Sequence, residues 1–190
     1  MNTLFAGVHA GLSGAMRLAC GQADGVRIMQ DALGGVAGSF RALALCMPIL
    51  IALRLMAWSD TVIPANPGRV LSRDMAMFTV AWLGFAVFSW HLSGLFKRQE
   101  NWPRFIVAWN WCSVVQNLLV LAGAVPQFLG APTILSQVAQ FVVMGWALWL
   151  EWYAVRLTLG VGMLTAAWIV LIDESLSLTV ASIGFALSGR

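Results

Sequence analysis

FIVAWNWCSVVQNLLVLAGAVPQFLGAPTILSQVAQFVVMGWALWL, residues 105–150, is a run of 46 residues without a formally charged side chain. Two prolines and a glycine interrupt this run within AVPQFLGAP, residues 124–132. A helix of about 20 apolar residues crosses the hydrocarbon core of a bilayer, and proline together with glycine favours a turn. The run therefore predicts two antiparallel membrane-spanning helices joined by a tight turn, at about residues 105–125 and 133–153.

Three further apolar stretches have roughly the length of a span. They cover about residues 39–58, 75–96 and 157–173. Polar segments rich in turn residues separate them from each other and from the central pair. The sequence therefore predicts an all-α fold, a polytopic transmembrane helical bundle of about five spans over residues 38–190, preceded by an N-terminal interfacial arm over residues 1–37.

The composition supports a membrane protein and excludes a soluble domain. Of the 190 residues, 60% are hydrophobic and only 10% are charged, with a mean hydropathy of +0.82. A soluble domain carries about 25% charged residues, which it needs to cover its surface. The net charge of +3 does not indicate nucleic-acid binding, because the basic side chains are scattered and flank the apolar runs.

The distribution of basic residues predicts the orientation. With the N-terminus in the cytoplasm, seven lysine and arginine residues lie inside and four lie outside, which agrees with the positive-inside rule. Ten of the eleven basic residues are arginine, which we interpret as a sign of a GC-rich bacterial genome. We therefore expect a multi-pass protein of the bacterial inner membrane with a cytoplasmic N-terminus.

The N-terminal arm has a weak helical pattern. Leu4, Val8, Leu12, Ala15 and Ala19 recur at spacings of three and four residues, which is typical of an amphipathic helix on the membrane face. Seven glycines interrupt the first 37 residues, and glycine is costly in a helix. A poorly ordered arm is the alternative.

The stretch IVLIDESLSLTV, residues 169–180, places Asp173 and Glu174 in an apolar run. One interpretation is that the two carboxylates mark the end of the fifth span and that a short C-terminal interfacial helix follows. A second is a partly buried ion pair between Arg54 and Asp173 or Glu174, which would tie the first span to the fifth. A third is an ion or proton pathway, which intramembrane carboxylates often mark.

Polar side chains form stripes on the third and fourth spans. Asn110, Ser113 and Asn117 share one helix face. In the fourth span a second face carries Gln137, Gln140, Met144, Ala147 and Glu151. Polar groups in lipid seek partners on neighbouring helices. The stripes predict either inter-helix hydrogen bonds, within the bundle or with a partner subunit, or the lining of a polar path for a solute.

Other ionisable residues are sparse. His91 in the second span fits a hydrogen-bonded packing residue or a proton-handling one. Glu151 near the end of the fourth span is expected to be solvated or paired with Arg156. The sequence contains no Walker motif, GxSxG, HExxH or CxxCH. We therefore assign no catalytic residue and no metal ligand, and the cofactor is unknown, although a tryptophan-rich bundle is compatible with a quinone or a pigment.

Three functions are compatible with these features. The first is a non-catalytic accessory, assembly or scaffold component of an inner-membrane complex, with the lipid bilayer and other membrane subunits or further copies of the chain as partners. The second is a small transporter or channel with a polar path between spans three and four. The third is an enzyme acting on a lipid-phase substrate, which the shortage of reactive side chains disfavours.

Overall fold

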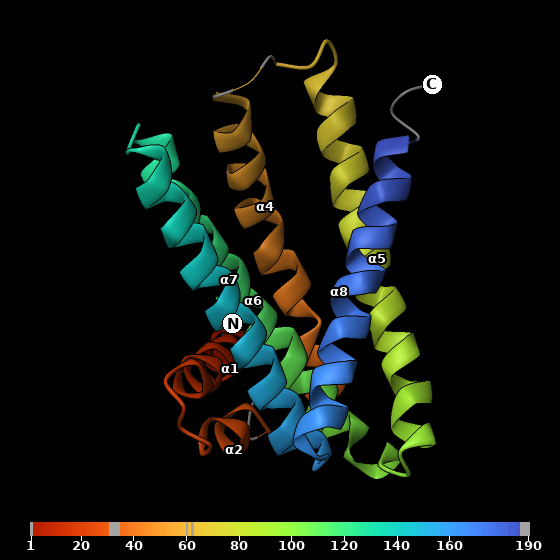
Figure 1. Ribbon diagram of the computed structural model, residues 1–190. Coiled ribbons are helices and arrows are strands. Elements are labelled where there is room, and N and C mark those ends of the chain that lie inside the picture. Colours follow the sequence, from red (N-terminus) through yellow and green to blue (C-terminus); the bar gives the residue numbers. More distant parts are fainter. Residues whose placement is uncertain (1, 31–34, 60, 62, 187–190) are drawn as a thin grey trace.

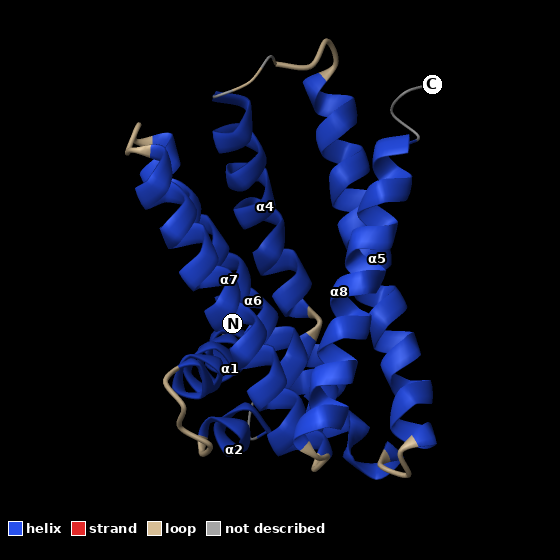
Figure 2. Ribbon diagram, in the orientation of Figure 1, coloured by secondary structure: helices blue, strands red, loops and turns tan. Residues whose placement is uncertain are grey.

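The chain folds as a helical membrane protein. The computed structural model describes residues 2–30, 35–59, 61 and 63–186, with side chains from residue 5 onward, and Figure 2 shows only helices and loops among them. Within this part of the chain, five helical segments are long and apolar enough to cross a bilayer. Each segment contains one long helix. These are α4 (Arg41–Ser59), α5 (Pro67–Leu95), α6 (Trp102–Phe128), α7 (Thr133–Leu159) and α8 (Met163–Ala186). The prediction of an all-α bundle of five spans is confirmed.

Helix α6 lies at the centre of the bundle. It packs against α4 on one side and α7 on the other, whereas α5 pairs with α8. Its first half, residues 105–115, is buried without interruption and carries no charged side chain. In Figure 1 the α5–α8 pair approaches α6 and α7 at the lower end and diverges from α4 at the upper end. The long helices therefore lie farther apart at the upper end of the bundle than at the lower end (Figure 1).

Proline and glycine mark several helix boundaries. Pro67 opens α5, where the missing amide hydrogen of proline costs nothing. Gly160 ends α7 with a φ of 65°, a left-handed conformation in which glycine is the favoured residue. Pro126 lies in the last turn of α6, so this helix ends at Phe128, slightly beyond the predicted end at 125.

The fifth span differs from the prediction. A single helix, α8, runs from Met163 through Asp173 and Glu174 to Ala186. The prediction that this span ends at residue 173, before a separate C-terminal interfacial helix, is therefore wrong. The physical reason is that Asp173 is buried against other helices and accepts a hydrogen bond from Trp109 of α6, so this carboxyl group does not end the helix.

The N-terminal arm is helical and packs on the bundle. It comprises α1 (Asn2–Ala19), α2 (Gly25–Gln30) and α3 (Gly35–Ser39). In Figure 1, α1 is seen nearly end-on, crosswise to the long helices at their lower end. Trp146 and Tyr153 of α7 donate hydrogen bonds to the carbonyl oxygens of Ala19 and Gly21, at 3.0 Å each.

Glycines explain why the arm packs so closely. A side chain at Gly11 would overlap the ring of Trp111 on α6, and one at Gly14 would lie 2.6 Å from the carbonyl oxygen of Gly25 on α2. Val8 and Leu12 of the predicted stripe pack against the core, and Ala15 and Ala19 are buried, whereas the side chain of Leu4 lies outside the described part. The glycines that weaken helix propensity thus permit tight tertiary contact.

Candidate functional site

A cavity of about 780 Å³ lies between the five long helices. We call it the central cavity. Its lining comes from the second halves of α4 and α8, the first half of α5, and the middles of α6 and α7. Because α5 runs antiparallel to α4 and α8, these segments lie at the same end of the bundle, the end opposite the N-terminal arm (Figure 1). The central cavity therefore belongs to the half in which the helices diverge.

Two buried carboxyl groups lie at the inner end of the central cavity. Asp173 on α8 is 8% exposed, and its Oδ2 accepts a hydrogen bond of 2.8 Å from Trp109 Nε1 on α6. Glu151 on α7 is 3% exposed. Its carboxyl group lies beside the carboxyl group of Asp173 and the side-chain amide of Gln116. We call Glu151 and Asp173 the carboxyl pair.

The carboxyl pair lacks one donor. Glu151 Oε1 is buried and has no hydrogen-bond partner among the described residues. The neighbouring Asp173 offers only acceptor oxygens unless a proton lies between the two groups. Two carboxylates side by side away from water require a counter-charge. The arrangement can therefore bind a proton or a small cationic group.

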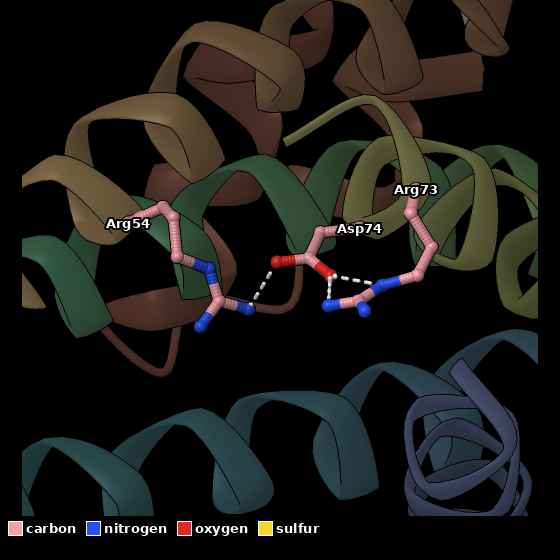
Figure 3. Close-up of polar contacts among 3 residues, drawn as sticks. All are labelled: Arg54, Arg73 and Asp74. Carbon is pink, nitrogen blue, oxygen red and sulfur yellow. Dashed lines mark hydrogen bonds and ion pairs between the residues drawn. The ribbon is translucent and has the colours of Figure 1, made fainter. Parts of the chain in front are cut away.

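An ion cluster lies nearer the outer end of the central cavity. Asp74 on α5 binds Arg54 of α4 through Oδ2 at 2.6 Å and Arg73 of its own helix through Oδ1 at 2.9 Å (Figure 3). Figure 3 shows the Asp74 carboxylate between the two guanidinium groups. The Arg54–Asp74 pair thus bridges α4 and α5 where the helices otherwise diverge.

The partner of Arg54 is therefore Asp74, which the sequence interpretation did not consider. Asp173 and Glu174 of the expected pair line the same cavity but bind no arginine within salt-bridge distance in the described part of the chain. Glu174 is half-buried. Arg54 lines the same cavity as its two expected partners, but which acidic residue binds it depends on helix packing.

Aromatic side chains separate the central cavity from the lower end of the bundle. Trp82 and Trp109 line its floor, with ring centroids 4.9 Å apart. Below them, the ring centroid of Phe85 lies 4.9 Å from that of Trp109 and 6.2 Å from that of Phe105. Both phenylalanines are fully buried. These buried, mutually packed rings lie between the floor of the central cavity and the lower end of α5 and α6.

The polar stripe of α6 is largely hydrogen-bonded. Asn110 is fully buried, accepts a bond of 2.8 Å from Trp82 Nε1 and donates one of 2.7 Å to Ser39 Oγ. Ser113 and Asn117 bond to carbonyl oxygens of α6 and also line the central cavity. Asn110 therefore connects α3, α5 and α6, whereas the other two residues contribute polar groups to the cavity wall.

The remaining candidates lie elsewhere. Gln137 and Gln140 of α7 are exposed and do not line the central cavity, and Gln140 donates a hydrogen bond of 3.0 Å to Gln127 Oε1. His91 is exposed on α5, also outside the cavity lining. Only the part of the α7 stripe nearer Glu151 therefore shares the central cavity with Ser113 and Asn117 of α6.

Glu151 requires a correction. It is neither solvated nor paired with Arg156, whose guanidinium carbon lies 4.8 Å above the ring of Trp152. The sequence signal was available, because Glu151 and Gln140 were on the same helical stripe, but its position near the end of an apolar run suggested an interface. Helix α7 continues to Leu159, so Glu151 lies two turns inside the helix.

Comparison with known proteins provides no relative. No family model, no curated protein and no solved structure matches this chain.

Proposed function

We propose that this protein is a small carrier of the bacterial inner membrane, which binds a solute in the central cavity and moves it across the bilayer. The observation that supports this proposal best is a cavity of about 780 Å³ lined by all five spans, with a buried carboxyl pair at its inner end. Ligand sites are typically concave, mostly apolar and equipped with a few polar groups. Intramembrane carboxyl groups commonly mark solute or ion routes.

A carrier fits the geometry better than an open channel. The packed rings of Trp109, Phe85 and Phe105 separate the central cavity from the lower end of the bundle. A site open to one face and closed to the other is one of the two states that alternating access requires. With the N-terminal arm in the cytoplasm, as the distribution of lysine and arginine favours, the open end would face the periplasm.

A second candidate is an accessory or scaffold subunit of an inner-membrane complex. The apolar wall of the central cavity, which includes Leu50, Phe78 and Leu178, would accept an apolar helix of a partner subunit or a second copy. In that case the cavity is a docking groove, and no solute enters it. Neither candidate requires a reactive side chain, so we do not propose an enzyme.

Cysteine accessibility separates these functions. Ser177 lines the central cavity, whereas Ser175, two residues away, points to roughly the opposite side of α8 and lies outside the lining. After replacement of the exposed Cys20 by serine, we expect a charged, membrane-impermeant thiol reagent to label Ser177→Cys in native membranes and to leave the matched control Ser175→Cys unlabelled. Labelling is measured by mass shift of the purified protein.

Each other outcome is informative. Labelling of Ser177→Cys only after purification in mild detergent would mean that a partner fills the central cavity in the membrane, and would favour the scaffold function over the carrier. Absence of labelling in both preparations would mean that the cavity does not admit a polar solute, and would contradict the carrier function.

A further inference from the structure

The lining of the central cavity contains more acidic than basic side chains. Among its described residues, the basic ones are Arg54 and Arg73, and both bind Asp74. Three further carboxyl groups have no basic partner within salt-bridge distance in the described part of the chain; they belong to Glu151, Asp173 and Glu174. The electrostatic field inside the cavity therefore favours a cation.

The carboxyl pair specifies what kind of cation fits. Glu151 Oε1 is buried, lines the central cavity and has no donor among the described residues. Asp173 already accepts the Trp109 indole bond. No three His, Cys, Asp or Glu side chains of the described residues are arranged to hold a metal ion. A positively charged group that donates a hydrogen bond, such as a protonated amine, supplies both missing features.

The walls indicate the rest of the ligand. Trp82 and Trp109 line the inner end. Aromatic rings close to a bound cation attract it. Toward the outer end the lining is mainly aliphatic and aromatic, with Leu50, Phe78 and Val120 among its members. A hydrophobic body attached to the amine would be buried there.

We propose that the central cavity binds an organic monocation, a protonated amine with an apolar body, and that the carboxyl pair is its counter-ion. This proposal rests on the carrier function proposed above. When the site is empty, one proton shared between Glu151 and Asp173 takes the place of the ammonium group. Ligand binding and proton binding are therefore mutually exclusive.

Three matched probes test the charge preference. Isothermal titration of the purified protein in mild detergent uses 4-phenylbutylamine, which is protonated, the anion 4-phenylbutyrate and the neutral 4-phenylbutan-1-ol. We expect saturable binding of the amine and at least about tenfold weaker binding of the other two. Equal affinity for the three probes would overturn the proposal.

Two isosteric substitutions test the counter-ion. We expect Glu151→Gln and Asp173→Asn each to weaken amine binding at least about tenfold, because the amides keep the shape but lose the charge. The control Glu100→Gln lies in the exposed 3₁₀ turn between α5 and α6, outside the cavity lining, and should leave the affinity unchanged. Unchanged affinity in both cavity variants would contradict the proposal.

Proton competition gives a readout that needs no variant. Lowering the pH should weaken binding of the amine to the wild-type protein, since a proton and the ammonium group compete for the carboxyl pair. The other ionisable groups near the pair are Glu174 on α8, Cys112 on α6, Arg54 on α4, and Arg73 and Asp74 on α5. If the affinity for the amine does not decrease as the pH is lowered, the proposal that amine and proton share one site is overturned. This test holds even if the variants fail to fold.

The outcome is distinguishable from failure of the carrier function. If Ser177→Cys is labelled but none of the three probes binds, the cavity is open and the assignment of the ligand class is wrong. If Ser177→Cys is not labelled in any preparation, both proposals fall.

Discussion

Asn110 shows how a single side chain can connect three helices. Its amide accepts from Trp82 on α5 and donates to Ser39 on α3, and no part of it is exposed. Because an amide in an apolar interior is costly unless it is hydrogen-bonded, these two bonds fix the positions of its neighbours. Trp82 is in turn part of the floor of the central cavity, so Asn110 also positions a wall of the candidate site.

We expect Asn110→Leu to destabilise the protein by about 1–3 kcal/mol, because leucine leaves the Trp82 indole and the Ser39 hydroxyl without this partner. The effect should appear as a lower temperature of thermal unfolding in detergent, followed by tryptophan fluorescence. The control Gln140→Leu alters an exposed amide and should change stability by no more than about 0.5 kcal/mol. Equal unfolding temperatures for the two variants would contradict this role of Asn110.

The sequence predicted part of the residue-scale picture. The spacing of Asn110, Ser113 and Asn117 indicated that one face of this helix is polar. Asn110 donates to Ser39 on α3, whereas Ser113 and Asn117 donate to carbonyl oxygens of α6 itself. It did not indicate that Trp82 or Ser39 would be the partners of Asn110, because those residues lie 28 and 71 positions away in the sequence. Helical periodicity gives the direction of a side chain, and only packing gives its partner.

At the scale of an element, α1 depends on glycine for its place in the fold. Gly11 lies against the ring of Trp111, so the addition of one methyl group there forces the helix or the ring to move. We expect Gly11→Ala to weaken the packing of α1 by about 1–3 kcal/mol, a typical cost of overpacking. Faster tryptic cleavage in the arm, for example after Arg17 or Arg27, would report its release.

The control for this prediction is Gly145→Ala in α7. Nothing lies within 4 Å of a side-chain carbon added at Gly145, and alanine is the better helix former. This variant should be cleaved no faster than the wild-type protein. Identical cleavage of Gly11→Ala and wild type would mean that the contact with Trp111 does not hold the arm.

Helix α8 shows why the element boundaries were only partly predictable. Hydropathy identifies an apolar segment by summing along the chain, so two adjacent carboxylates were interpreted as the end of a span. In three dimensions Asp173 accepts a hydrogen bond from Trp109, 64 residues earlier, and the helix continues past it. A charge inside a span is tolerated when a neighbouring helix supplies a partner, and that neighbour is not visible in the local sequence.

At the scale of the whole molecule, the sequence predicted the number of spans and one neighbour relation. The short turn between α6 and α7 implied that these helices pack side by side, as they do. The pairing of α5 with α8 joins segments distant in the sequence, and contacts such as Gly184 with Met77 gave no sequence signal. Because the central cavity is lined by α5 and α8 together with the other three helices, it could not be predicted without that pairing.

The threading of the chain through the bilayer makes one further prediction. The turn between α5 and α6 and the turn between α6 and α7 lie at opposite ends of the bundle (Figure 1). If the N-terminal arm is cytoplasmic, a fusion after Arg98 places a reporter in the cytoplasm and a fusion after Gly130 places it in the periplasm. We expect fluorescence from a green fluorescent protein fused after Arg98 and activity from an alkaline phosphatase fused after Gly130.

Exchanging the two reporters is the control and should abolish both signals, because each reporter works in one compartment only. The reverse pattern would place the open end of the central cavity in the cytoplasm, and signals on the same side at both positions would mean that α6 does not cross the membrane.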